Sequence, residues 1–181
     1  EIVLMQKLVL FLGHPTYATS VVLSSLLAFA GLGSFVARRF EISRRNMTVL
    51  AVILVAVVVV VAGAIHGMID IFLGLSLSAR IAVVVAALAP LGFVLGIPFP
   101  TGIRIVSDQC PQLLPWAWAI NGLLSVFSSI FCIVLSMAVG FSTVLVLAAI
   151  IYAGGFAAMI GWLPRPSESR EPMVTVDAAG R

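Results

Sequence analysis

The feature that most constrains the fold is a stretch of twenty residues without a formal charge, from Met47 to His66, which reads MTVLAVILVAVVVVVAGAIH. An α-helix needs about 20 consecutive apolar residues to cross about 30 Å of hydrocarbon. A soluble domain of 181 residues has no place for so long an apolar run. The whole chain is 62% hydrophobic and 9% charged, whereas an average soluble domain has roughly 25% charged residues. The stretch therefore predicts a membrane-spanning helix.

Other apolar stretches resemble this one, so we expect an all-α fold, a polytopic transmembrane helix bundle. The bundle should have five complete spans and a partial N-terminal helix within residues 1–12. The spans are predicted at about 15–37, 47–66, 81–97, 115–139 and 141–162. Together they form one transmembrane domain, 1–162, followed by a disordered cytoplasmic tail, 163–181, which is rich in Pro, Ser and alternating charges.

The segments between the spans are predicted from their length and their breaking residues. The run 71–79 is too short to cross and predicts an interfacial or re-entrant segment. Pro98-Phe99-Pro100 should terminate the third span, because each proline removes a backbone donor and disfavours αR in the residue before it. Residues 101–114 are then a polar connector. The second span shows no polar stripe, so we expect it at the lipid-facing periphery of the bundle.

Lysine and arginine predict the orientation. With five spans, eight arginines lie on one side of the membrane (38, 39, 44, 45, 104, 165, 170 and 181), and the other side has only Lys7 and Arg80. The positive-inside rule places the first side in the cytoplasm, together with the C-terminus. The same arginines account for the net charge of +3, so we expect the lipid bilayer as a partner and no nucleic acid.

The sequence contains no motif that indicates a disulfide, a metal site or a catalytic site. Cys110 lies in the polar connector and Cys132 in the fourth span, so a disulfide is not expected, and no Cys/His cluster suggests a metal. No P-loop, nucleophile elbow or zinc-protease motif is present. We therefore predict no catalytic residue, no metal and no cofactor in this chain. It begins with Glu inside an apolar run and without a signal peptide, which is typical of a fragment.

Polar residues inside the spans are the candidates for a membrane site. In the fourth span one helical stripe carries Asn121, Ser125, Ser128, Cys132 and Ser136. This stripe must face protein or water, which leaves two alternatives: hydrogen bonding between helices or a hydrated path. The break at 96–102, followed by Arg104, either ends a span or lines a binding site. Further candidates are Glu1 and Gln6 in the first apolar run, the pair His14 and Tyr17, and the pair His66 and Asp70.

Small residues should mark the closest helix packing. In the first span these are Ser20, Ser24, Ala28, Gly31 and Ser34, and in the fifth Ala153, Gly154, Ala157, Ala158 and Gly161.

Two passages of the chain resemble a known family. The first is Glu1-x-x-Leu4-x-Gln6, Leu12-Gly13-His14-Pro15-Thr16-Tyr17, Val21-Val22-Leu23 and Gly31-Leu32-Gly33-Ser34. The second is PFPTGIR at 98–104, PWAWAING at 115–122 and Ser125-Val126. Both are similar to the C-terminal membrane region of bacterial membrane-bound spermidine-synthase-like proteins, over most of residues 1–162.

This resemblance implies a cytoplasmic nucleotide-binding domain, of the aminopropyltransferase or methyltransferase type, in the same parent protein. Any site for decarboxylated S-adenosylmethionine or putrescine would lie in that domain, outside this chain. The resemblance carries over Glu1, Gln6, His14, Tyr17, Arg104 and Asn121 as membrane-site residues, and the polar stripe adds Ser125. It implies a module in the bacterial inner membrane that anchors the parent protein and forms an intramembrane cavity for a lipophilic or polyamine substrate. The alternatives are a transporter-like permease with a path along the fourth-span stripe, and a non-catalytic structural subunit.

Overall fold

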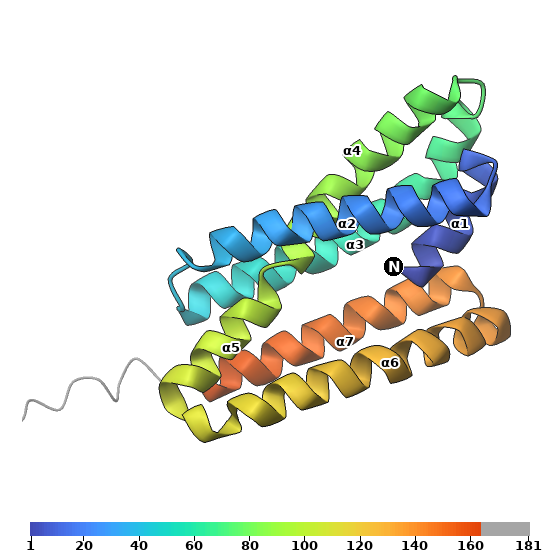
Figure 1. Ribbon diagram of the computed structural model, residues 1–181. Helices are drawn as coiled ribbons and strands as arrows, with labels where there is room; N and C mark the ends of the chain where they lie inside the picture. Colours follow the sequence, from blue (N-terminus) through green and yellow to red (C-terminus); the bar gives the residue numbers. More distant parts are fainter. Residues whose placement is uncertain (164–181) are drawn as a thin grey trace, which may run out of the picture.

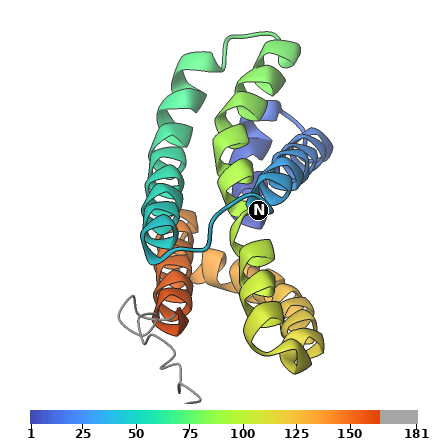
Figure 2. The same ribbon diagram turned by 90° about the vertical axis from the view of Figure 1, so that its left-hand side faces the viewer.

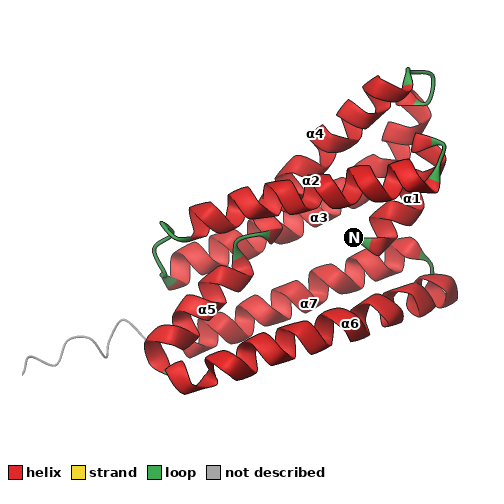
Figure 3. Ribbon diagram, viewed as in Figure 1, coloured by secondary structure: helices red, strands yellow, loops and turns green. Residues whose placement is uncertain are grey.

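The computed structural model describes residues 1–163, except the side chains of residues 66 and 68–70. Within this range the chain is helical with short loops and no strand (Figure 3), which confirms the all-α prediction. In order, the helices are α1 (Ile2–Leu12), α2 (Pro15–Ala37), α3 (Arg44–Phe72), α4 (Leu77–Leu95), α5 (Pro98–Gln109), the 3₁₀ turn η1 (Pro111–Leu113), α6 (Leu114–Val139) and α7 (Phe141–Trp162).

Within residues 1–163, five helical segments are long and apolar enough to cross a bilayer, so the chain has the architecture of a multi-pass membrane protein. They are Pro15–Ala37, Arg44–Ile65, Leu77–Gln109, Pro111–Val139 and Phe141–Trp162, of which the third joins α4 to α5. The predicted spans at 15–37 and 141–162 coincide with α2 and α7. The N-terminal helix α1 is apolar but shorter than a span.

The helices run side by side between two ends of the bundle (Figures 1 and 2). We call one the Arg80 end, where α1 turns into α2 and α3 into α4, and the other the Arg104 end, where α2 turns into α3 and α5 into α6. The interface of α2 with α4 is the most extensive, and α3 contacts both α4 and α7. Helix α6 lies at the edge, against α7, α1 and α5.

The structure corrects the prediction for the segment 71–79. Helix α3 continues to Phe72, α4 begins at Leu77, and only a short loop separates them. There is thus no independent interfacial segment. The polar residues around 66–70 suggested that the helix had already ended, but polar groups are tolerated in the last turns of a spanning helix that reaches the headgroup level.

The connector predicted at 101–114 is also wrong, because it is helical. Helix α4 ends at Leu95 and, after Gly96 and Ile97, α5 starts with Pro98 as its first residue. The first four N–H groups of a helix have no intrahelical partner, so prolines in the first turn lose nothing and their fixed φ suits the helix. Pro98 and Pro100 therefore end one helix and begin the next.

Three glycines allow α2 and α4 to approach closely. A Cβ on Gly96 would lie 2.0 Å from the carbonyl oxygen of Ala30, and one on Gly92 would lie 3.1 Å from that of Leu26. On α2 the corresponding residue is Gly33, whereas a Cβ on the predicted Gly31 would meet nothing within 4 Å. The predicted small face of α7 is likewise exposed, at Ala153, Gly154, Ala157, Ala158 and Gly161. Small residues therefore do lie where α2 and α4 approach most closely, but on a different face of α2 from the predicted one.

One side of the valine-rich helix α3 is exposed, as the sequence suggested, and its other side packs against α4 and α7. One stripe of its larger residues is buried, at Met47, Leu50, Leu54, Val58, Val61 and Ile65. Its spacing of three or four residues is that of a helix face. Because valines occur on all sides of this helix, its buried face cannot be recognised from the sequence.

Helix α6 is the most exposed of the long helices, since Ser136 is its only buried residue. Its surface presents large apolar side chains such as Phe131 and Met137, which are 69% and 83% exposed. This surface suits contact with lipid. The tail predicted at 163–181 begins with a buried residue, Leu163; the remainder of that prediction lies outside the described residues.

Candidate functional site

The site residues predicted from the sequence do not converge on one place. Glu1 is the N-cap residue of α1 and Gln6 lies on the same helix, and both side chains are exposed. Glu1 lies near the middle of the bundle (Figure 1), close enough to Tyr152 of α7 for an electrostatic interaction. Arg104, by contrast, lies on α5 at the Arg104 end.

His14 and Tyr17 do lie together, at the turn from α1 to α2. The His14 ring is the N-cap of α2, and its Nδ1 accepts a hydrogen bond of 3.2 Å from the backbone N–H of Thr16. The two rings meet edge to face, with their centroids 5.9 Å apart. Gly13 makes the turn possible, because its φ of 79° is left-handed. The arrangement closes a helix N-terminus and leaves both side chains exposed.

Arg104 binds the carboxyl end of α2. Its Nη1 donates to the carbonyl oxygens of Ala37 at 2.9 Å, Phe40 at 3.1 Å and Arg38 at 3.4 Å. These carbonyls lie at a helix C-terminus, where unpaired C=O groups carry partial negative charge. Beside it, the fully buried Thr101 donates 2.8 Å to the carbonyl oxygen of Ile97 at the helix break. The break is thus satisfied within the protein.

The two motifs of the second passage contact each other at this end. Phe99 of PFPTGIR meets Trp118 of PWAWAING edge to face, with ring centroids 5.0 Å apart. The contact fixes the start of α6 against the start of α5.

The polar stripe of α6 lies along an exposed face. Asn121, Ser125 and Ser128 are exposed, Cys132 is half-buried and Ser136 is buried. The serine hydroxyls bond within the helix, Ser125 to the carbonyl oxygen of Asn121 at 2.7 Å and Ser136 to that of Cys132 at 2.6 Å. Among the described residues, no side chain pairs with the Asn121 amide.

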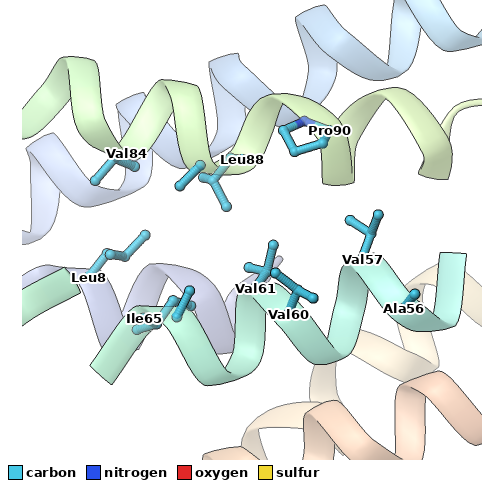
Figure 4. A pocket seen from close by; sticks show the side chains of 11 residues that line it. Leu8, Ala56, Val57, Val60, Val61, Ile65, Val84, Leu88 and Pro90 are labelled. Carbon is cyan, nitrogen blue, oxygen red and sulfur yellow. The ribbon is translucent and has the colours of Figure 1, made fainter. Parts of the chain in front are cut away.

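A pocket of about 350 Å³ lies between α3 and α4, in the half of the bundle toward the Arg80 end. Figure 4 shows that side chains from both helices point into it, with Leu8 of α1 at one side. The described residues that line it are all apolar: Leu8, Ala56, Val57, Val60, Val61, Ala64, Ile65, Val84, Ala87, Leu88 and Pro90. The floor is buried (Leu8, Val61, Ile65, Val84 and Leu88), and the rim is exposed (Ala56, Val60, Ala64 and Pro90). The pocket therefore opens sideways, toward the lipid.

Arg80 precedes Val84, which lines this pocket, by one turn of α4. Its Nη1 donates a hydrogen bond of 2.9 Å to the carbonyl oxygen of Phe11, in the last turn of α1. Its Nε donates a second one, also of 2.9 Å, to the carbonyl oxygen of Leu75. Residue 84, on the pocket floor, is four residues along the same helix and so on the same face. The guanidinium thus lies on the side of the pocket toward the Arg80 end of the bundle.

Neither the pocket nor the position of Arg80 is evident in the sequence. The pocket depends on which helices are neighbours, and valine and alanine give no sign of that. In the prediction of orientation, Arg80 is only one of the two cations on its side of the membrane. Its place four residues before a buried Val84 was the one available signal.

The described residues hold no group of three or more His, Cys, Asp or Glu side chains that could bind a metal. No protein-family model, no curated protein and no solved structure matches the chain. The resemblance to spermidine-synthase-like membrane regions therefore rests on the quoted motifs.

Proposed function

We propose that this chain is the integral membrane module of a larger spermidine-synthase-like protein. The module anchors a cytoplasmic nucleotide-binding domain at the bacterial inner membrane and offers an intramembrane cavity to a lipophilic chain. The carbon-lined, laterally open pocket between α3 and α4 is the observation that carries the proposal. Clefts of about 300–1,000 Å³ are typical of small-molecule sites.

The pocket favours a lipophilic ligand over a polyamine. A polyamine carries several positive charges, and a charge in a low-dielectric site needs an opposite charge or hydrogen-bond acceptors. None of the described residues that line the pocket has a carboxylate, amide or hydroxyl side chain. An alkyl chain needs none of these groups.

The anchoring role is tested by fusing a soluble reporter domain to the N-terminus and washing the membranes with alkaline carbonate. We expect the fusion to stay in the membrane pellet, while the free reporter stays in the supernatant. A fusion released by the wash would reject the proposal. The link to a nucleotide-binding domain is tested by reading the gene upstream of Glu1, and a reading frame that lacks such a domain would contradict that part.

A transporter-like permease is the second candidate function, and Asn121 favours it. An unpaired amide on a spanning helix is costly in lipid, and in transporters such groups mark a path. In proteoliposomes that take up radiolabelled putrescine, Asn121→Leu should reduce the flux. Phe127→Leu, on the opposite face of α6, is the control. Equal flux in both variants would remove the stripe from any path.

A further inference from the structure

We propose that the pocket between α3 and α4 binds one acyl chain of a phospholipid whose phosphate group contacts Arg80. The inference rests on the proposed function, which gives the cavity to a lipophilic chain, and adds the chemical class of that ligand and the residue that selects it.

Two helices place the guanidinium at the end of the pocket. On α4, Arg80 is followed one turn later by Val84 on the pocket floor. On α1, the carbonyl oxygen of Phe11 accepts a hydrogen bond of 2.9 Å from Arg80. Phe11 lies one turn from Leu8, which is on the pocket floor. One helical turn is about 5.4 Å. A phosphate at Arg80 would therefore stand about one turn from the first carbon-lined part of the pocket, as a headgroup stands above its acyl chain.

Arg80 retains capacity for an anion. Two of its nitrogens, Nε and Nη1, donate to backbone carbonyls, which fixes the guanidinium plane. Among the described residues, none accepts from Nη2. The carbonyls offer only partial charge, whereas a phosphate offers a full charge and several acceptor oxygens, and such charge-assisted bonds are among the strongest in proteins.

The shape of the pocket suits a single alkyl chain. Along α3 it extends from Ala56 to Ile65, which is about 13 Å at about 1.5 Å per residue. A volume of about 350 Å³ holds roughly ten to twelve groups of the size of water or methylene, at about 30 Å³ each. Because the rim faces outward, a chain can enter from the bilayer without crossing the headgroup layer.

The test uses the full chain in lipid nanodiscs and a phosphatidylglycerol probe with a photoreactive diazirine near the end of one acyl chain. After illumination, we expect adducts on the peptides that contain residues 56–65 and 84–90. The variant Ala87→Phe fills the pocket and should abolish these adducts. The control Ala82→Phe adds the same ring at an exposed position of α4 outside the pocket and should leave the adducts in place.

The contact with Arg80 is tested by a second comparison. Loss of one hydrogen bond to a charged group weakens binding by about tenfold. Arg80→Gln should therefore reduce labelling by phosphatidylglycerol about tenfold, and Arg80→Lys should retain part of it. A diacylglycerol probe with the same diazirine chain should label the wild type weakly and be indifferent to Arg80→Gln. Excess inorganic phosphate should not compete, because the acyl chain supplies part of the binding.

The outcomes separate the two proposals. If Arg80→Gln leaves phosphatidylglycerol labelling unchanged while Ala87→Phe abolishes it, the phosphate contact is wrong and the lipophilic cavity stands. If Ala87→Phe and Ala82→Phe label alike, no chain enters the pocket, and the cavity in the proposed function falls with the inference. Membrane anchoring is measured by the carbonate wash and is independent of both.

Discussion

A Cβ atom on Gly33 would lie 1.9 Å from the carbonyl oxygen of Phe93, far inside the closest approach that two such atoms tolerate. The contact joins the backbone of α2 to that of α4 at the most extensive interface of the bundle. In lipid, where burial of apolar surface gives no advantage between helices, close backbone packing is one of the main sources of helix association. The crossing therefore sets how α2 and α4 pair.

We expect Gly33→Ala to destabilise the bundle, because backbone atoms must move to admit the methyl group. Overpacking of this kind costs about 1–3 kcal/mol. Gly31→Ala is the matched control, since its Cβ meets nothing within 4 Å and alanine favours a helix by about 0.5–1 kcal/mol over glycine. Thermal unfolding in detergent measures both. Equal melting temperatures would contradict the crossing.

The buried stripe of α3 gives a second prediction. Leu54 is 0% exposed and its neighbour Ile53 is 44% exposed. In lipid the removed methyl groups cost little transfer energy, so the cavity accounts for most of the loss, and Leu54→Ala should cost about 1–2 kcal/mol. Ile53→Ala should stay within about 0.5 kcal/mol of the wild type. A larger loss for Ile53→Ala in unfolding experiments would place that face of α3 against protein.

The hydrogen bonds of Arg104 give a third prediction. Arg104→Ala removes one of two donors from the carbonyl of Ala37, which keeps its bond from the Phe40 N–H, and it removes the Arg104 donor from the carbonyl of Phe40. Hydrogen bonds to a charged group are worth about 1.5–3 kcal/mol when buried, and this guanidinium is half-buried, so we expect a loss of about 1–2 kcal/mol. Arg39→Ala, at an exposed position in the same loop, should change the unfolding temperature little. A comparable loss in both variants would argue for a general charge effect instead.

The orientation is open to cysteine labelling. Cys110 follows α5 at the Arg104 end, and Cys132 lies within α6. If that end is cytoplasmic, a membrane-impermeant maleimide should label Cys110 in inverted vesicles and not in intact cells. Cys110→Ser should remove the signal, since Cys132 is inside a span. Labelling in intact cells would reverse the orientation.

The sequence was sufficient for the spans and insufficient for their pairing. The ends of α2 and α7 follow from composition, because a change from apolar to polar residues marks the edge of the hydrocarbon. The start of α5 is not evident in the sequence, because proline usually ends a helix, whereas Pro98 stands in the first turn, where a helix needs no backbone donor. The sequence does not show which face of α2 packs against α4, because Gly31 and Gly33 are equally small. Only the position of the partner helix decides which of them lies at the crossing.

The candidate site was predictable only in its local parts. The pairing of His14 with Tyr17 follows from their spacing of three residues, and so does the stripe from Asn121 to Ser136. The position of Arg80 depends on its contact with Phe11, 69 residues away in the chain. The pocket depends on which faces of α3 and α4 meet. No periodicity within one helix contains that information.

Three arginines each bind the carboxyl end of a helix other than their own: Arg80 on α1, Arg104 on α2, and Arg44 on Leu163 after α7. Phe11 and Arg80 are 69 residues apart, and Ala37 and Arg104 are 67 apart. When the chain is synthesised from its N-terminus, α1 and α2 are therefore made before the arginines that donate to their last carbonyls. The contacts that Arg80 makes with α1 and Arg104 with α2 therefore form only after α4 and α5 have been made.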